Sequence, residues 1–294
     1  GGHHQANEAV GEALRQLRPD TALRHTDYLT HVRPYERDLV LGVYLYLLRS
    51  MPATYRWYYH FTDRESEPKA IRDTYKWMGR SGLRRELREY RPNLVISSYP
   101  TPAAVAGNLR RKEGFDFFNA LVITDYRIHQ HWVRPEADLS LVATPEAREQ
   151  LIARGIPKER VAVTGIPIHP KYQALQGANK AALREKHGLR ADIPLILISG
   201  GAQGTYRSLE RVLSALAHLG QRVQVLVLAG KPSVSEEGGT IIHRLGFTTT
   251  FAELLAASDL VVGKAGGLTV AESTALGIPM VIYDPIPGQE EYNA

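Results

Sequence analysis

The chain has 294 residues, of which 44% are hydrophobic and 23% charged, which excludes an intrinsically disordered protein. It has no cysteine, which excludes a disulfide scaffold, a thiolate metal site and a cysteine nucleophile. The 36 Lys and Arg residues against 31 Asp and Glu residues give a net charge of +5, a mild basic excess that suits a nucleotide diphosphate, an anionic lipid or a nucleic acid.

The length is sufficient for two domains of ordinary size. The sequence shows no signal peptide and no run of roughly 18 or more apolar residues that could span a bilayer. It opens at Gly1 without a methionine or a preceding strand, and it stops at Ala294 just after a strand. We therefore expect a fragment that lacks an element at each end.

The first predicted element is a helix that follows two glycines and two histidines. Apolar residues between Ala6 and Leu17 recur on one helical face, and Pro19 ends the pattern. His3 lies at the loop-to-helix junction, and histidine suits a general base because its ordinary pKa is near neutrality. A helix-capping or solvent-exposed histidine is the alternative.

Residues 39–61 form an unusual stretch of aliphatic and aromatic side chains punctuated by arginines. Its continuous apolar part is too short to span a membrane. Amphipathic aromatic residues mixed with arginines suit a surface that lies in the lipid headgroup layer. An ordinary core helix with solvated arginines is the alternative.

From residue 93 onward, predicted strands and helices alternate, which indicates parallel sheets covered on both faces, with ligands at the carboxyl ends of the strands. The polar residues 169–180 interrupt the pattern and predict a linker, so we expect domains at 1–168 and 169–294. The predicted strands are 93–98, 119–124, 139–143, 161–164, 195–199, 223–228, 240–242, 260–262 and 280–283, and the predicted helices are 101–111, 145–154, 181–187, 208–219, 251–257 and 269–276.

Two glycine turns of the second half precede helices. Residues 200–204 follow a strand, and residues 263–267 follow another. A helix N-terminus behind glycines can bind an anion. Thr269 and Glu272 have the spacing of a capping box, so spacing alone favours Glu272 as the cap of its own helix, although its carboxylate could instead accept hydrogen bonds from sugar hydroxyls.

The segments 263–273, 287–293 (with its Pro-Gly-Gln-Glu motif) and 164–168 together resemble the monogalactosyldiacylglycerol synthases and processive diacylglycerol glucosyltransferases. The N-acetylglucosaminyltransferase of peptidoglycan lipid II synthesis is a more distant relative. The resemblance covers nearly the whole chain. It implies an α/β fold of the GT-B type, in which two Rossmann-like parallel-sheet domains face a central cleft, truncated here at both ends. Domain 1–168 would face acceptor and membrane, and domain 169–294, incomplete at its C-terminus, would bind the UDP-sugar.

The same resemblance implies the roles of individual residues. His3 would be the general base, Glu272 would hold the ribose hydroxyls of UDP, and Gln289 would contact the sugar. Residues 124–132 match the Thr-Asp-x-x-x-His-x-x-Trp pattern of the bacterial enzymes, which lies on the acceptor side. The donor-side candidates are Gly200, Gly201, Gln203, Gly204, Phe247, Gly266, Gly267, Thr269, Glu272, Gln289 and Glu290, and the acceptor-side candidates are Thr124, Asp125, His129 and Trp132.

The implied activity is an inverting transfer of a hexose from UDP-glucose or UDP-galactose to the hydroxyl of diacylglycerol, at the cytoplasmic face of an anionic membrane to which the protein binds peripherally. No Asp-x-Asp occurs, and His129 with His131 lacks a third metal ligand, so helix N-termini and loop amides would stabilise the UDP leaving group without a metal or other cofactor. The alternatives are N-acetylglucosaminyl transfer to a lipid-linked muropeptide and a non-catalytic nucleotide-sugar-binding subunit. Nucleic-acid binding ranks lowest, because no clustered basic patch or motif supports it.

Overall fold

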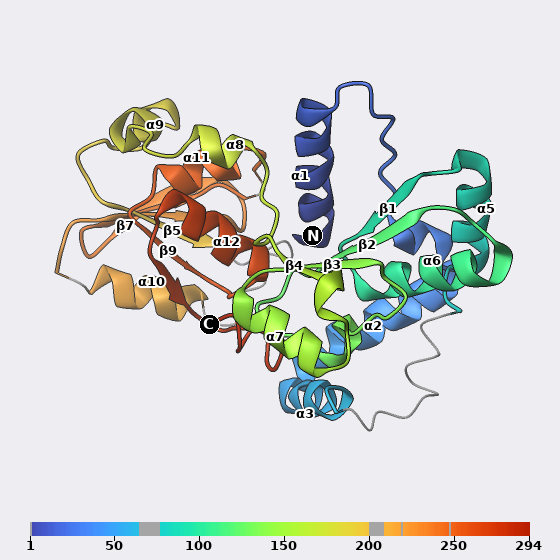
Figure 1. Ribbon diagram of the computed structural model, residues 1–294. Coiled ribbons are helices and arrows are strands. Elements are labelled where there is room, and N and C mark those ends of the chain that lie inside the picture. The colour runs from blue at the N-terminus through green and yellow to red at the C-terminus, as the bar shows by residue number, and fades with distance from the viewer. Residues whose placement is uncertain (1, 65–76, 200–208, 219, 247) are drawn as a thin grey trace. The chain divides into compact units, whose positions relative to one another are not determined.

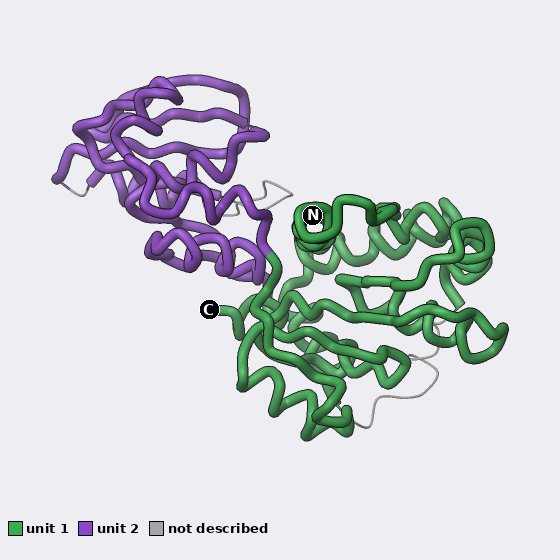
Figure 2. Tube along the Cα trace, turned by 45° about the horizontal axis from the view of Figure 1, so that its top comes forward, with its two compact units in different colours: residues 1–167, 287–293 green, residues 168–286, 294 purple. Residues whose placement is uncertain are grey.

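The structure is a computed structural model that describes residues 2–64, 77–199, 209–218, 220–246 and 248–294 (Figure 1). The chain forms two compact units (Figure 2). Unit 1 holds the residues up to Pro167 together with Pro287–Asn293, and unit 2 holds Ile168–Ile286 and Ala294. The sequence-based division assigned 169–294 to the second domain, whereas the contacts of Pro287–Asn293 lie within unit 1.

Unit 1 begins with helices that precede its sheet: α1 (Gly2–Leu17), the 3-10 helix η1 (Tyr28–His31), α2 (Pro34–Ser50), α3 (Pro52–Thr62) and α5 (Arg80–Tyr90). α1 starts at Gly2, so His3 lies in its first turn rather than in a preceding loop. Pro34 and Pro52 stand at the first position of their helices, where a missing N–H costs no hydrogen bond. The aromatic stretch 39–61 is therefore two helices that meet at Met51.

The sheet of unit 1 has the strand order β1-β2-β3-β4 and is parallel throughout. The strands are β1 (Leu94–Ser97), β2 (Phe118–Val122), β3 (Leu139–Val142) and β4 (Val161–Val163), and between them lie α6 (Pro100–Glu113), η2 (Gln130–Trp132), α7 (Pro145–Ala153) and η3 (Lys158–Arg160). This is the predicted alternation. Because parallel strands end at a common edge, the residues that follow β1 and β2 are brought together there.

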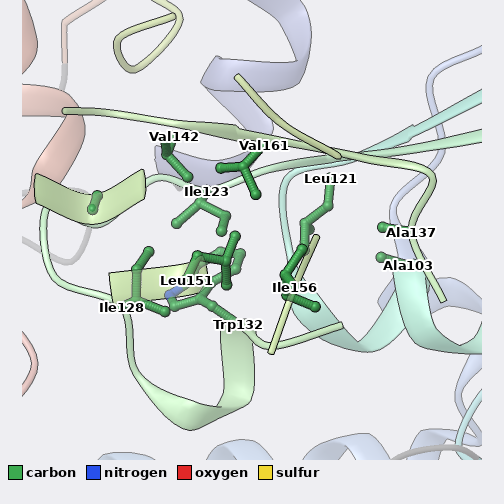
Figure 3. Packing of buried hydrophobic residues seen from close by; sticks show 11 residues of the cluster. Ala103, Leu121, Ile123, Ile128, Trp132, Ala137, Val142, Leu151, Ile156 and Val161 are labelled. Carbon is green, nitrogen blue, oxygen red and sulfur yellow. The ribbon is translucent and has the colours of Figure 1, made fainter. Parts of the chain in front are cut away.

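Two apolar clusters fill unit 1. In the first, Leu121 of β2 and Leu151 of α7 pack with Ile128 and Trp132 from the segment between β2 and β3 (Figure 3). In the second, leucines of α5 pack against α6 and Phe117. Trp132 is therefore part of the core as well as of the predicted acceptor pattern, which fixes the segment that carries it.

The sheet of unit 2 has the order β10-β9-β5-β6-β8-β7, with every pair parallel except β7 and β8. Its strands are β5 (Leu195–Ser199), β6 (Gln224–Val227), β7 (Ser233–Glu237), β8 (Thr240–Arg244), β9 (Leu260–Gly263) and β10 (Met280–Ile282). The sequence predicted all of these except β7. That strand is exposed along its whole length and reads Ser-Val-Ser-Glu-Glu, so it lacks the apolar signal on which strand prediction depends.

The helices of unit 2 are α8 (Lys171–Ala174), α9 (Lys180–Lys186), α10 (Leu209–Ala217), α11 (Phe251–Ala256) and α12 (Gly267–Leu276). Alternate residues of β5 enter two different clusters. Leu195 and Leu197 pack with α11, whereas Ile196 and Ile198 pack with α10. Because successive side chains of a strand point to opposite faces, both faces of this sheet are covered.

Candidate active site

The candidate region of unit 1 lies where β1 and β2 end, and it contains His3. The Ser98 hydroxyl donates to the His3 carbonyl oxygen at 2.7 Å. The Thr124 hydroxyl lies 3.1 Å from His3 Nδ1. Both residues follow strands of the same sheet, so the sheet edge fixes the first turn of α1 and the direction of the imidazole.

Burial lowers the pKa of His3 below the ordinary histidine value. The ring of Tyr99 stands edge-on to the imidazole at 5.2 Å between centroids, and the indole of Trp132 lies at 6.1 Å. This surrounding keeps His3 neutral near pH 7, which is the form that can accept a proton.

Asp125 is the centre of the acceptor-side residues. The indole N–H of Trp132 donates to Asp125 Oδ2 at 2.7 Å, and the side chain of Asn293 also hydrogen-bonds the carboxylate. Burial raises the pKa of Asp125 to about 6 despite these bonds. The predicted residues His3, Thr124, Asp125 and Trp132 thus form one connected group.

His129 joins the acceptor segment to α3. It is 4% exposed, and its Nδ1 accepts the His131 backbone N–H at 3.0 Å. Its proton is then on Nε2, which lies 2.9 Å from the Tyr59 carbonyl oxygen and donates to it. Burial, reinforced by His131, lowers the pKa of His129 to about 4. Both ring nitrogens are engaged within the protein, so His129 holds the segment in place.

Residues 287–293 lie against α3. The Tyr55 hydroxyl donates to Gln289 Oε1 at 3.3 Å, and Arg56 forms an ion pair with Glu291 at 3.3 Å. The negative charge of Glu290 contributes to the raised pKa of Tyr44, whose main cause is burial. Gln289 and Glu290, predicted for donor binding, are therefore held by helices of unit 1.

A separate candidate region, in unit 2, is the start of α12. A Cβ at Gly263 would lie 2.5 Å from the Ser199 carbonyl oxygen, so the pairing of β9 with β5 requires glycine there. The helix begins at Gly267, and its N-cap Gly266 supplies no side-chain hydrogen bond. The first-turn amides, including that of Thr269, are thus not capped by a side chain.

The capping-box prediction for Thr269 and Glu272 is wrong, because α12 begins two residues before Thr269. Glu272 is instead 5% exposed and is hydrogen-bonded to Tyr172, a residue of α8 that is 2% exposed. Burial raises the pKa of Glu272 to about 7, although Tyr172 and the positive charge of Lys171 oppose the rise. A buried carboxyl group with such a pKa marks a candidate ligand site rather than a helix cap.

The remaining donor-side candidates, Gly200, Gly201, Gln203, Gly204 and Phe247, lie outside the described residues. Residues that contact the candidates and that the sequence did not single out include Ser98, Tyr99, Tyr172 and Asn293. Ser98 could have been found as the last residue of the predicted strand 93–98, at the carboxyl end where ligands bind. Tyr172 lies in the short helix α8, within the polar residues 169–180, and Asn293 follows the last strand, so no strand or helix pattern in the sequence marks either one.

Within the described parts of the chain, no three or more His, Asp or Glu side chains gather in a way that could hold a metal ion. None of the helices in these parts is long and apolar enough to cross a membrane.

The pattern that defines the family described as monogalactosyldiacylglycerol (MGDG) synthase matches residues 3–168. The chain belongs to the monogalactosyldiacylglycerol synthase family. Residues 195–294 match the C-terminal domain of glycosyltransferase family 28. The family resemblance stated from the sequence motifs is thereby confirmed.

Two curated members illustrate the relationship. A protein of Staphylococcus saprophyticus named processive diacylglycerol beta-glucosyltransferase is 29% identical over 303 residues, covering 100% of this chain and 75% of that protein. One of the same name from Bacillus pumilus is 31% identical over 248 residues, covering 82% of this chain and 63% of that protein.

Solved structures agree on the fold. MurG of Acinetobacter baumannii has a TM-score of 0.51 at 19% identity, with 73% of this chain and 60% of that chain covered. A Staphylococcus aureus MnaA–UDP structure has a TM-score of 0.54 at 15% identity, covering 73% of this chain and 63% of that one. The GT-B fold class expected for this family member is confirmed.

Proposed function

We propose that this chain is an inverting glycosyltransferase that transfers a hexose from a UDP-sugar to the hydroxyl of diacylglycerol. The observation that carries the proposal is the setting of His3: a half-buried, neutral imidazole, held by Thr124 at the end of β2, in a chain that belongs to a family of glycolipid synthases. The relatives are named for glucosyl transfer, which favours UDP-glucose over UDP-galactose as the donor.

His3 would act as the general base. When Nδ1–H donates to the Thr124 hydroxyl, Nε2 keeps its lone pair. Nε2 takes the proton of the acceptor hydroxyl while the acceptor oxygen forms a bond to the anomeric carbon. The bond between that carbon and the UDP oxygen breaks on the opposite face, so the configuration inverts and UDP leaves as the anion.

Unit 2 would hold UDP. The Glu272 carboxylate accepts hydrogen bonds from the ribose hydroxyls, and Tyr172 fixes its orientation. The first turn of α12, with the amides of Gly266, Gly267 and Thr269, offers a positive helix end to the diphosphate, so that no metal ion is required for departure of UDP. Further donor contacts in the proposal come from Gly200, Gly201, Gln203, Gly204, Phe247, Gln289 and Glu290.

The membrane-facing surface in this proposal is formed by α2 and α3. α2 is rich in apolar residues, yet none of its residues is buried. Residues 33–62 carry four arginines and two carboxylates, an excess that suits anionic headgroups. An exposed apolar surface of this kind indicates an interaction site, and we assign it to the anionic cytoplasmic leaflet. The exposed side chains are Tyr35, Leu39, Val40, Leu41, Val43, Tyr46, Met51 and Trp57.

Replacing Leu39, Val43 and Tyr46 together with serine is expected to weaken membrane binding. These residues share one face of α2. Each substitution removes on the order of 1 kcal/mol of apolar transfer free energy, so the membrane partition coefficient should fall about tenfold for every one or two side chains replaced. Co-sedimentation with phosphatidylglycerol vesicles measures the change. Val234→Ser, at a position of β7 that is 69% exposed, is the matched control and should leave partitioning unchanged. Equal partitioning of the triple variant and wild type would remove α2 from the membrane surface.

The transfer itself is tested by the products. The protein is mixed with diacylglycerol vesicles and radiolabelled UDP-glucose or UDP-galactose, and the lipids are separated by thin-layer chromatography. We expect a labelled glycolipid from diacylglycerol. Label that enters a lipid-linked muropeptide instead would favour N-acetylglucosaminyl transfer. UDP binding without any labelled lipid would indicate that the protein is a non-catalytic nucleotide-sugar-binding subunit.

A further inference from the structure

We propose that Asn293 is a positioning residue for the acceptor side of the site: it holds the Asp125 carboxylate and the Tyr126 backbone, and thereby keeps the indole of Trp132 against His3. This inference rests on the proposed function, because it assigns Asn293 a part in presenting the acceptor to the general base. Asn293 itself contacts no reacting atom in this assignment.

The hydrogen bonds of Asn293 define the arrangement. Its Oδ1 accepts the backbone N–H of Tyr126 at 3.1 Å, and its side chain also hydrogen-bonds Asp125. A carboxylate can only accept, so the Asn293 amide N–H is the donor to Asp125. Asparagine supplies one acceptor and two donors on the same short side chain, which allows it to bind both neighbouring residues at once.

The Asp125 carboxylate connects Asn293 to the two residues that contact His3. Asp125 Oδ2 accepts the Trp132 indole N–H at 2.7 Å, and the Trp132 ring lies 6.1 Å from the His3 ring. Thr124, directly before Asp125, contacts His3 Nδ1 at 3.1 Å. A shift of Asp125 would therefore move both neighbours of the imidazole.

Asp125 needs the Asn293 donor because the residue is partly buried and its carboxylate is shielded from water. A buried carboxylate keeps its charge only when hydrogen-bond donors replace water, and even with both donors burial raises the pKa of Asp125 to about 6. The charge of Asp125 also reaches Tyr59 of α3, whose pKa is raised by burial and by that charge, and the His3 ring of α1 lies 6.1 Å from the Trp132 ring, from which Asp125 accepts a hydrogen bond. Arg127 and Tyr292 flank the segment, with the guanidinium 3.6 Å from the Tyr292 ring centroid.

The position of Asn293 is secured by the residues before it. Gly288 packs so closely under Tyr59 that a Cβ would lie 2.8 Å from the ring. Arg56 pairs with Glu291, and Arg127 stacks on Tyr292. The segment 287–293, which carries Gln289, thus packs on α3 and ends in Asn293, the residue that holds Asp125 and Tyr126 in place.

The experiment reads Trp132 directly. The chain has three tryptophans, so Trp57→Phe with Trp77→Phe leaves Trp132 alone. Because the Asp125 carboxylate bonds to its indole N–H, Trp132 emission is expected to titrate with a midpoint near pH 6. Asn293→Ala in this background removes one donor to a charged group, and the midpoint is expected to rise by about one to two pH units. Asn293→Asp, which also lacks the donor, should raise it further. Asp125→Asn should abolish the titration.

Activity gives the second readout. In the otherwise unchanged protein, Asn293→Ala is expected to lower kcat about tenfold while the KM for the UDP-sugar changes less than about twofold. Asn293→Ala added to Asp125→Asn should cause a much smaller further loss than Asn293→Ala causes alone, because Asn293 acts mainly through Asp125 and only its bond to the Tyr126 backbone remains to be lost.

The outcomes separate the two proposals. A Trp132 midpoint that Asn293→Ala and Asn293→Asp leave unchanged, an emission that does not titrate between about pH 5 and 8, or multiplicative losses in the double variant would each overturn the role of Asn293. A wild-type protein that transfers no hexose while its Trp132 midpoint shifts as expected would overturn the proposed function and leave the Asn293–Asp125 linkage standing.

Discussion

Replacing His3 with alanine is expected to abolish hexose transfer and to leave UDP binding close to that of wild type. General base catalysis contributes on the order of 10²- to 10⁴-fold, and kcat should fall by that factor. UDP affinity should persist, because Glu272 and the first turn of α12, which are proposed to hold UDP, belong to unit 2, whereas His3 belongs to unit 1. The measurement is initial rates of labelled glycolipid formation together with calorimetry of UDP binding.

The adjacent histidine is the matched control. His4 has a side chain that is 60% exposed and lies 3.5 Å from Glu8, one turn along α1. His4→Ala should change kcat by less than about twofold, since an exposed pair of this kind contributes little. Normal turnover by the His3→Ala protein, or an equal loss in both variants, would remove His3 from the mechanism. Circular dichroism of each variant checks that α1 remains folded.

Replacing Glu272 with glutamine is expected to weaken UDP binding by on the order of ten- to a hundredfold. Glutamine keeps the size of the side chain and an oxygen that can accept from Tyr172, so the change removes mainly the charge and one acceptor. Hydrogen bonds to a charged group contribute about 1.5–3 kcal/mol, which corresponds to this range. Isothermal calorimetry with UDP measures the loss, and uridine diphosphate release assays report the KM of the donor.

The pH dependence of the same binding gives an independent check. The pKa of Glu272 is raised to about 7, so wild-type protein should lose UDP affinity as the pH falls through 7 and the carboxyl group gains a proton. Glu272→Gln should lack this dependence. Glu253→Gln is the control: Glu253 belongs to α11 and pairs with Lys186 and His187, each at 2.8 Å, and its loss should not alter UDP affinity. A Glu272→Gln protein that binds UDP as wild type does would exclude Glu272 from the donor site.

The alternation of strands and helices could be predicted because it depends on short stretches of sequence, namely apolar runs and the glycines and prolines that end them. Leu195–Ser199 is a short apolar strand, and Gly277 ends α12 in the left-handed conformation that glycine adopts most readily. β7 could not be predicted, since its polar residues are ordered by pairing with β8 rather than by burial.

Individual residues of the candidate site could be predicted from the sequence, but most contacts between them could not. The motifs supplied His3, Thr124 and Glu272, but the contact between His3 and Thr124 joins residues 121 positions apart and depends on how β2 ends beside α1. The spacing alone favours Glu272 as the cap of its own helix, which is wrong, because capping spacing is local whereas Tyr172 contacts Glu272 from another helix. The return of residues 287–293 to unit 1 follows from contacts that no sequence period encodes.

The absence of buried residues in α2 has a consequence for which substitutions this helix can accept. In the close-packed interior around Leu121, one added or missing methylene is felt as a void or an overlap. The exposed face of α2 is under no such packing constraint, so hydrophobicity and helix propensity decide which residues it accepts. Leucine, methionine, valine and phenylalanine are then nearly interchangeable along its outer face. Two enzymes that catalyse the same reaction can therefore have no identical residues in this part of their sequences.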